Sequence, residues 1–154
     1  MNALFDSKYI PVSNDLAAGT GTTNCTVVDL ADFDSIEVIT KLGALAAGAA
    51  VLVKLQQGAL ANGSDMADLE GTGISITEPA ASGTGVTYEQ KLVVHDLARP
   101  RERYVRPVIV RSTANAEVDA VLVRLYNARQ KATSQDDDYV ADSEFHLSPA
   151  EGTA

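Results

Sequence analysis

Residues 104–127 read YVRPVIVRSTANAEVDAVLVRLYN and decide the fold class of this chain. The stretch is rich in Val, Ile, Leu and Tyr, and β-branched and aromatic residues favour strands. Two runs, Tyr104–Ser112 and Glu117–Asn127, flank Thr113–Ala116, a length typical of hairpin connections. Apolar residues occupy both parities of each run, so we expect a central hairpin that is covered on both faces. Pro107 indicates an edge or a bulge, because proline has no amide hydrogen to donate.

Short apolar segments of the same kind recur before this hairpin, separated by turn residues. Apolar and polar residues alternate at 51–56 and again at 86–94, where the even-numbered positions, Val94 among them, are predicted to face inward. Residues 43–50 are small and contain two glycines, so they are predicted to be a turn. This regular spacing predicts an all-β fold, an antiparallel β-sandwich or jelly-roll. The other predicted strands are Thr26–Leu30, Ser35–Lys41, Val51–Gln56, Gly73–Glu78 and Val86–Val94.

The chain divides into three parts by composition. Residues 1–25 carry few large apolar groups and are interpreted as an N-terminal extended arm. Residues 26–129 form the predicted sandwich domain, and residues 130–154 form an acidic C-terminal arm without apolar periodicity. Because arms of this composition do not order themselves, we expect a neighbouring molecule to order them.

The chain has 154 residues, of which 45% are apolar, enough for one domain with its own core. Its formal net charge of −9 argues against binding a nucleic-acid backbone through a broad basic surface. The charge is uneven: residues 1–98 carry −8, residues 99–131 carry +5, and residues 132–154 carry −6. No apolar window is long enough to span a membrane and no signal peptide is visible, so we expect a product made in the cytoplasm.

Candidate catalytic groups are few, with one Cys, two His and no Trp. Cys25 has no histidine near it in the sequence that could act as its base, so we expect a small buried residue rather than a nucleophile. His95 and Asp96 are neighbours on a predicted strand, which places their side chains on opposite faces and excludes a dyad. The sequence therefore predicts a protein that is not an enzyme and that has no cofactor.

Two acidic stretches could be imagined as cation sites. Asp65, Asp68 and Glu70 lie in a predicted loop, but their spacing does not match a calcium-binding loop. Asp136–Asp138 is a run of charges without a glycine turn. We expect both to be solvated acidic segments and predict no metal site.

The densest feature is the arginine-rich segment 99–107. In an extended chain Arg99, Arg101 and Arg103 project to one side and form a row suited to carboxylates, with Arg106 just beyond. One interpretation is a solvated strand entry that balances the chain's own acids. The other is a contact with an acidic partner, such as the 136–144 tail of another copy of the chain. The residues predicted to make partner contacts are Arg99, Arg101, Arg103, Arg106, Asp136, Asp137, Asp138 and Tyr139.

Four stretches of the sandwich resemble small virion proteins encoded near the major capsid gene of tailed bacteriophages. They are Asp34–Ile39, Ala50–Gln56, Arg103–Val110 and Val121–Arg129, and the resemblance covers roughly residues 26–129. It implies a capsid decoration (cement) protein, a compact β-sandwich that binds the outside of the expanded head and staples neighbouring capsomers. The chain departs from that pattern in its long loop at Gly58–Glu70 and in its acidic tail.

The expected function is therefore that of a structural virion protein on the capsid exterior, with the major capsid protein as its partner. The resemblance also implies a homo-oligomer, a trimer or a dimer, with the trimer favoured. Nucleic acid and membranes are not expected as partners. Two alternatives remain open: a carbohydrate-binding or host-adhesion module on the virion surface, and a tail or connector component. The first would favour exposed aromatic residues, and the second would show ring symmetry.

Overall fold

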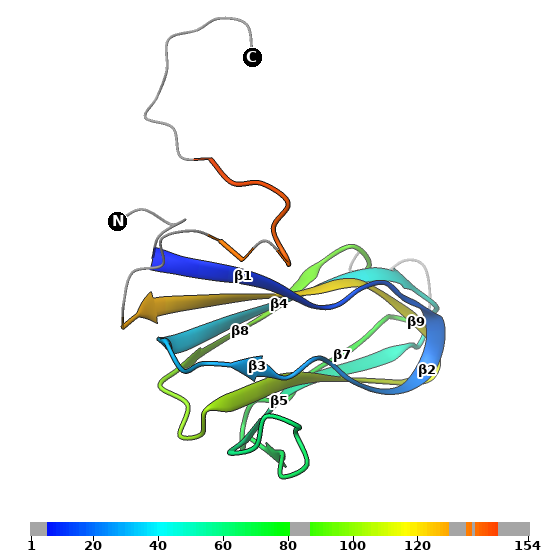
Figure 1. Ribbon diagram of the computed structural model, residues 1–154. Helices are drawn as coiled ribbons and strands as arrows, with labels where there is room; N and C mark the ends of the chain where they lie inside the picture. Colours follow the sequence, from blue (N-terminus) through cyan, green and yellow to red (C-terminus); the bar gives the residue numbers. More distant parts are fainter. Residues whose placement is uncertain (1–5, 81–86, 130–134, 137, 145–154) are drawn as a thin grey trace, which may run out of the picture.

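The computed structural model describes residues 6–80, 87–129, 135–136 and 138–144. It is an antiparallel all-β sandwich, as predicted. Figure 1 shows two layers that are joined at one side, where β2 and β9 pass from one layer to the other. The strands are β1 (Ser7–Ser13), β2 (Leu16–Asn24), β3 (Val28–Asp29), β4 (Phe33–Leu45), β5 (Ala50–Gly58), β6 (Ala67–Asp68), β7 (Ile74–Thr77), β8 (Leu92–Ala98) and β9 (Tyr104–Ala128).

Strand β9 belongs to both layers. Its residues 116–128 pair with β4 on one side, and residues 121–126 pair with β1 on the other. Because β4 also pairs with β8, sheet 1 has the order β1, β9, β4, β8. Residues 104–112 of β9 pair instead with β5, which gives sheet 2 the order β2 and β3, β9, β5, then β6 and β7.

The predicted hairpin of Tyr104–Ser112 with Glu117–Asn127 is therefore wrong. The two runs pair with different strands, and the residues between them form a corner at which β9 bends, with Thr113 at φ +70°. Nη1 of Arg111 donates to the carbonyl oxygens of Ala17 at 2.7 Å and Ala116 at 2.9 Å, which ties β2 to this corner. Strand order cannot be read from the length of the connecting segment alone.

Strands β1 and β2 belong to the sandwich, so the interpretation of 1–25 as an arm outside it is wrong for their residues, while residues 1–5 lie outside the described part of the chain. Strand β1 lies along β9 in sheet 1, and β2 crosses the corner to pair with β9 in sheet 2. Gly21 has φ +123° at this crossing, a conformation that residues with a Cβ rarely adopt. The small side chains that indicated an arm permit a strand to bend around an edge.

The proline in β9 lies in a central position, flanked by β5 on one side. On the other side, the carbonyl oxygen of Pro107 accepts a hydrogen bond from the amide of Cys25. The nitrogen and the carbonyl of one residue point to the same side of an antiparallel strand, so the Pro107 nitrogen, which has no hydrogen to donate, also points toward Cys25. The neighbouring strand is interrupted at that point, between Asn24 and Val28. The missing amide hydrogen therefore falls in the gap between β2 and β3.

The core lies between the two sheets. Sheet 1 contributes alternate residues of β4 and β9, and sheet 2 contributes alternate residues of β5 and β9. The largest fully buried side chains are Ile36, Leu42, Leu55, Ile109 and Leu125.

Strand β8 departs from its predicted alternation. The strand begins at Leu92, and Val93 and His95 face the core while Leu92 and Val94 face outward, 57% and 45% exposed. The prediction that the even-numbered positions face inward is wrong for these two residues. Val86, which belonged to the same predicted pattern, lies outside the described residues.

Candidate functional site

The arginine-rich segment forms the loop that joins β8 to β9 at one end of the sandwich. Residues 101–103 have no regular secondary structure, and Arg99 has φ +51°. Its amide donates to the carbonyl oxygen of Asp34 at 2.7 Å, and that of Arg101 donates to the side chain of Gln57 at 3.2 Å. The loop is thus held from both sheets.

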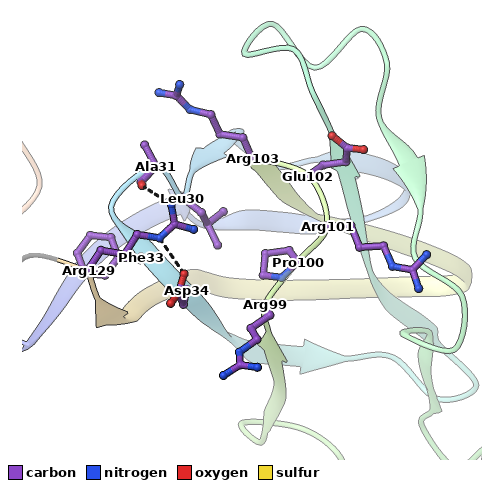
Figure 2. Close-up of a pocket in the computed structure, with 10 residues that line it drawn as sticks. All are labelled: Leu30, Ala31, Phe33, Asp34, Arg99, Pro100, Arg101, Glu102, Arg103 and Arg129. Carbon is purple, nitrogen blue, oxygen red and sulfur yellow. Dashed lines mark hydrogen bonds and ion pairs between the residues drawn. The ribbon is translucent and has the colours of Figure 1, made fainter.

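The expected row of arginines on one side is wrong, because the segment is not extended. Figure 2 shows the guanidinium groups of Arg99, Arg101 and Arg103 pointing in three different directions. They surround a hollow of about 550 Å³ at this end of the sandwich, together with Arg129. The hollow is also lined by Leu30, Ala31, Phe33, Asp34, Pro100 and Glu102.

Two of these four arginines are already paired. Nε and Nη2 of Arg103 donate to the two carboxylate oxygens of Asp29 at 2.7 and 2.6 Å. These hydrogen bonds lower the pKa of Asp29 and raise that of Arg103. Nε of Arg129 donates to Asp34 at 2.9 Å. These two ion pairs agree with the first interpretation of the segment, in which its arginines balance acidic residues of the same chain.

The other two arginines differ. Within the described residues, the guanidinium groups of Arg99 and Arg101 have no acidic partner, and both residues are exposed. Arginine presents a planar set of donors that fits a carboxylate in a bidentate manner. These two side chains can therefore accept a carboxylate without breaking an existing ion pair.

Arg106 lies away from this hollow, although the sequence grouped it with the others. It is in β9, where its Nε donates to Gln56 of β5 at 2.8 Å. Its guanidinium group also lies beside Gly63, in the loop that follows β5. It links strand and loop within the chain.

In the described part of the chain, the acidic tail contacts β1, and neither Asp136 nor Asp138 forms an ion pair with the arginine loop. Asp136 forms an ion pair with Lys8 at 2.6 Å, and this hydrogen bond lowers the pKa of Asp136. Tyr139 is 45% exposed and, with Asp136, lines a second hollow of about 300 Å³. Asp138 is exposed and donates its amide to Asp136, and Asp137 lies outside the described residues.

Sequence reasoning missed Gln135, which anchors this tail. The side chain is buried, donates to the carbonyl oxygen of Ser7 at 2.8 Å, and accepts from the amide of Tyr9 at 3.2 Å. It thereby satisfies backbone groups on the free edge of β1. A single glutamine in a polar stretch carries no signal that could have revealed this role.

Cys25 and His95 have the structural roles that the sequence indicated. Cys25 is 5% exposed, and burial raises the pKa of its thiol to about 11, an effect that the positive charge of Arg106 partly offsets. His95 faces the core and donates from Nε2 to the carbonyl oxygen of Thr72 at 2.7 Å, while Asp96 faces outward.

The carboxylates of Asp65, in the loop after β5, and of Asp68, in β6, bind groups of the chain itself. Asp65 accepts from the amides of Ala59 and Leu60 at 2.8 and 3.2 Å, and Asp68 pairs with Lys54 at 2.6 Å. Among the described residues, no three His, Cys, Asp or Glu side chains gather as they would around a metal ion. In the same part of the chain, no helix has the length and apolarity needed to cross a membrane.

No protein-family model and no curated protein matches this chain. The chain is similar in structure to a carbohydrate-binding module of Cellvibrio mixtus lichenase 5A in complex with cellotriose, with a TM-score of 0.33 and 12% identity over 80% of this chain and 97% of the module. It is also similar to a chain in the structure of infectious bursal disease virus, Gt strain, with a TM-score of 0.36 and 11% identity. That match covers 80% of this chain and 32% of the viral one. Neither similarity informs the function of this protein.

Proposed function

We propose that this protein is a structural virion protein that binds the outer surface of a bacteriophage head and stabilises contacts between major capsid proteins. The observation that carries the proposal is the pair of exposed arginines, Arg99 and Arg101, at the rim of the hollow. Their guanidinium groups are available to carboxylates of a shell surface. The resemblance of residues 26–129 to phage virion proteins supports the same role.

The paired arginines support the proposal by fixing the shape of the site. Arg103 holds the loop to Asp29 of β3, and Arg129 pairs with Asp34, whose carbonyl oxygen also accepts the amide of Arg99. The loop that carries Arg99 and Arg101 is thereby held on both sides. A prearranged loop loses less conformational freedom on binding than a mobile one, which favours modest contacts repeated over a lattice.

A binding assay on heads tests the proposal. Heads of the phage that encodes this chain, prepared without the protein, are mixed with purified protein and sedimented. We expect saturable binding in a fixed ratio to the major capsid protein. Changing both Arg99 and Arg101 to Glu should weaken binding at least tenfold, since each charged hydrogen bond contributes about 1.5–3 kcal/mol.

Lys91→Glu is the control, because it changes the charge of an exposed side chain at the opposite end of β8. It should leave binding unchanged. Failure of the wild-type protein to sediment with heads contradicts the proposal, as does equal loss in the control. Protein found at a ring-shaped tail or connector site by electron microscopy, or retained by polysaccharide but not by heads, supports an alternative function instead.

A further inference from the structure

The outer face of sheet 1 carries an apolar row that crosses all four strands. The register aligns Pro11 of β1 with Leu122 of β9, Leu122 with Ile39 of β4, and Ile39 with Val94 of β8. Ile39 and Leu122 are half-buried, and Val94 is 45% exposed. Leu92, two residues before Val94 on the same face, is the most exposed large apolar side chain among the described residues.

A polar row lies on one side of the apolar row. Tyr9, Arg124, Glu37 and Asp96 are aligned across the same four strands. Nε of Arg124 lies 3.2 Å from a carboxylate oxygen of Glu37, and both side chains remain partly exposed. Asp96 accepts a hydrogen bond from the hydroxyl of Tyr126. Opposite charges thus stand side by side on β9 and β4, the two central strands.

We propose that this face packs against the same face of a second copy of the chain. The two-fold axis runs parallel to the strands, between β4 and β9. This operation places Ile39 on the partner's Leu122 and Val94 on the partner's Pro11. It also places Glu37 on the partner's Arg124, and Arg124 on the partner's Glu37, so that the polar rows form a group of four alternating charges.

The other two-fold axis that could bring these faces together runs along the apolar row, across the strands. It would place Val94 on the partner's Val94, and Glu37 on the partner's Lys41. It would also place the carboxylate of Asp96 on the partner's Leu92 and the guanidinium of Arg124 on the partner's Ala120. Burying charges against apolar groups is costly. The axis parallel to the strands places one charged side chain in this way, Lys41 on the partner's Ala120, whereas the axis across the strands places two, so the parallel axis is favoured.

The expected contact is small. Four strands spaced about 4.8 Å apart, over seven residues of about 3.4 Å each, make a face of roughly 450 Å². A standard stable interface buries about 800 Å² per partner. The pair should therefore form only at high protein concentration, or where a lattice holds two copies close together. This inference does not depend on the proposed binding to a phage head.

Sedimentation velocity over a range of protein concentration tests the association. We expect the wild-type protein to shift from monomer to dimer, and Val94→Glu to remain monomeric. Ile74→Glu is the matched control: its side chain is 37% exposed but lies on β7 in sheet 2, so dimers should persist. Circular dichroism verifies that each variant is folded. A wild-type protein that stays monomeric or forms trimers overturns the inference, as does equal loss in both variants.

Cross-linking tests the axis. A chain with Val94→Cys is mixed with a chain with Pro11→Cys and treated with a short thiol cross-linker. We expect the mixed pair to be linked, because Val94 faces the partner's Pro11. Val94→Cys alone should give no linked dimer. If Val94→Cys links to itself as efficiently as it links to the mixed partner, the proposed axis is wrong.

Discussion

The two parts of β9 obey different rules. In residues 104–112, side chains of both parities are buried, among them Val105, Val108 and Ile109. In residues 121–126, buried residues alternate strictly with half-exposed ones. On the even-numbered face of the first part Val108 is buried between half-buried neighbours, whereas the second part has no buried residue on its even-numbered face and leaves that face of sheet 1 accessible. We therefore expect substitutions in the first part to affect mainly folding stability, and substitutions on the outer face of the second part to affect mainly contacts with a partner.

The largest expected effect is a cavity in the first part. Ile109 is fully buried, so Ile109→Ala should lower the free energy of unfolding by about 2–5 kcal/mol. Leu122→Ala, on the outer face of the second part, should cost about 1 kcal/mol or less in dilute monomeric protein. Urea unfolding followed by circular dichroism measures both. Equal costs would contradict the distinction between the two parts.

This contrast was only partly visible in the sequence. Mixed parity in Tyr104–Ser112 predicted burial on both faces, and on the even-numbered face this is confirmed only at Val108, because the other even-numbered residues are half-buried or exposed. The same mixed parity in Glu117–Asn127 has another cause: the register shifts between Lys41 and Leu42 as they pair with β9, and the buried parity changes from Val118 to Val121. A bulge reverses which parity is buried without leaving a compositional signal.

The candidate site was predictable in its residues but not in its geometry. The charge count singled out the arginines, since charge is a property of composition. Their partners depend on non-local contacts, such as that of Arg129 with Asp34, separated by 95 positions in the chain. The direction of each guanidinium follows from a loop with a left-handed residue, where alternation no longer applies.

The second prediction concerns pH and Cys25, whose amide donates to Pro107 in the first part of β9. The folded thiol has a pKa of about 11, whereas an unfolded thiol titrates near 8.5–9. As pH rises from about 9 to 11, the unfolded chain loses this proton and the folded chain keeps it. Stability should therefore fall with rising pH, by about 3 kcal/mol from this group.

Cys25→Ala removes the titrating group and is the comparison. The difference in unfolding free energy between wild type and variant should be constant at pH 6–8. Above pH 9 the unfolding free energy of the wild type should fall relative to that of the variant. Urea unfolding at several pH values measures it. Parallel curves up to pH 11 would show that the thiol is not protected by burial.

The third prediction addresses the free edge beside the second part of β9. Gln135→Ala removes the two hydrogen bonds to Ser7 and Tyr9 on β1, and each is expected to contribute about 0.5–1.5 kcal/mol. We expect a loss of about 2 kcal/mol and faster hydrogen exchange at the Tyr9 amide. Asp138→Ala, an exposed change in the same tail, should alter neither. Unchanged exchange at Tyr9 in Gln135→Ala would contradict the docking of the tail.

The smallest expected effect concerns the ion pair beside the start of the first part. Hydrogen bonds from Arg103 lower the pKa of Asp29, so the folded carboxylate keeps its charge at a pH where the unfolded one binds a proton. The pair therefore stabilises the fold above the ordinary aspartate pKa, and the contribution is lost as pH falls through the lowered value. NMR titration should place the Asp29 midpoint below its ordinary value in wild type and raise it in Arg103→Ala. Because the pair is exposed and screened, thermal stability near neutral pH should change little. A large loss of stability in Arg103→Ala would mean that the exposed loop helps to hold the buried first part of β9 in place. The distinction between a stabilising interior and an accessible surface would then not apply to this loop.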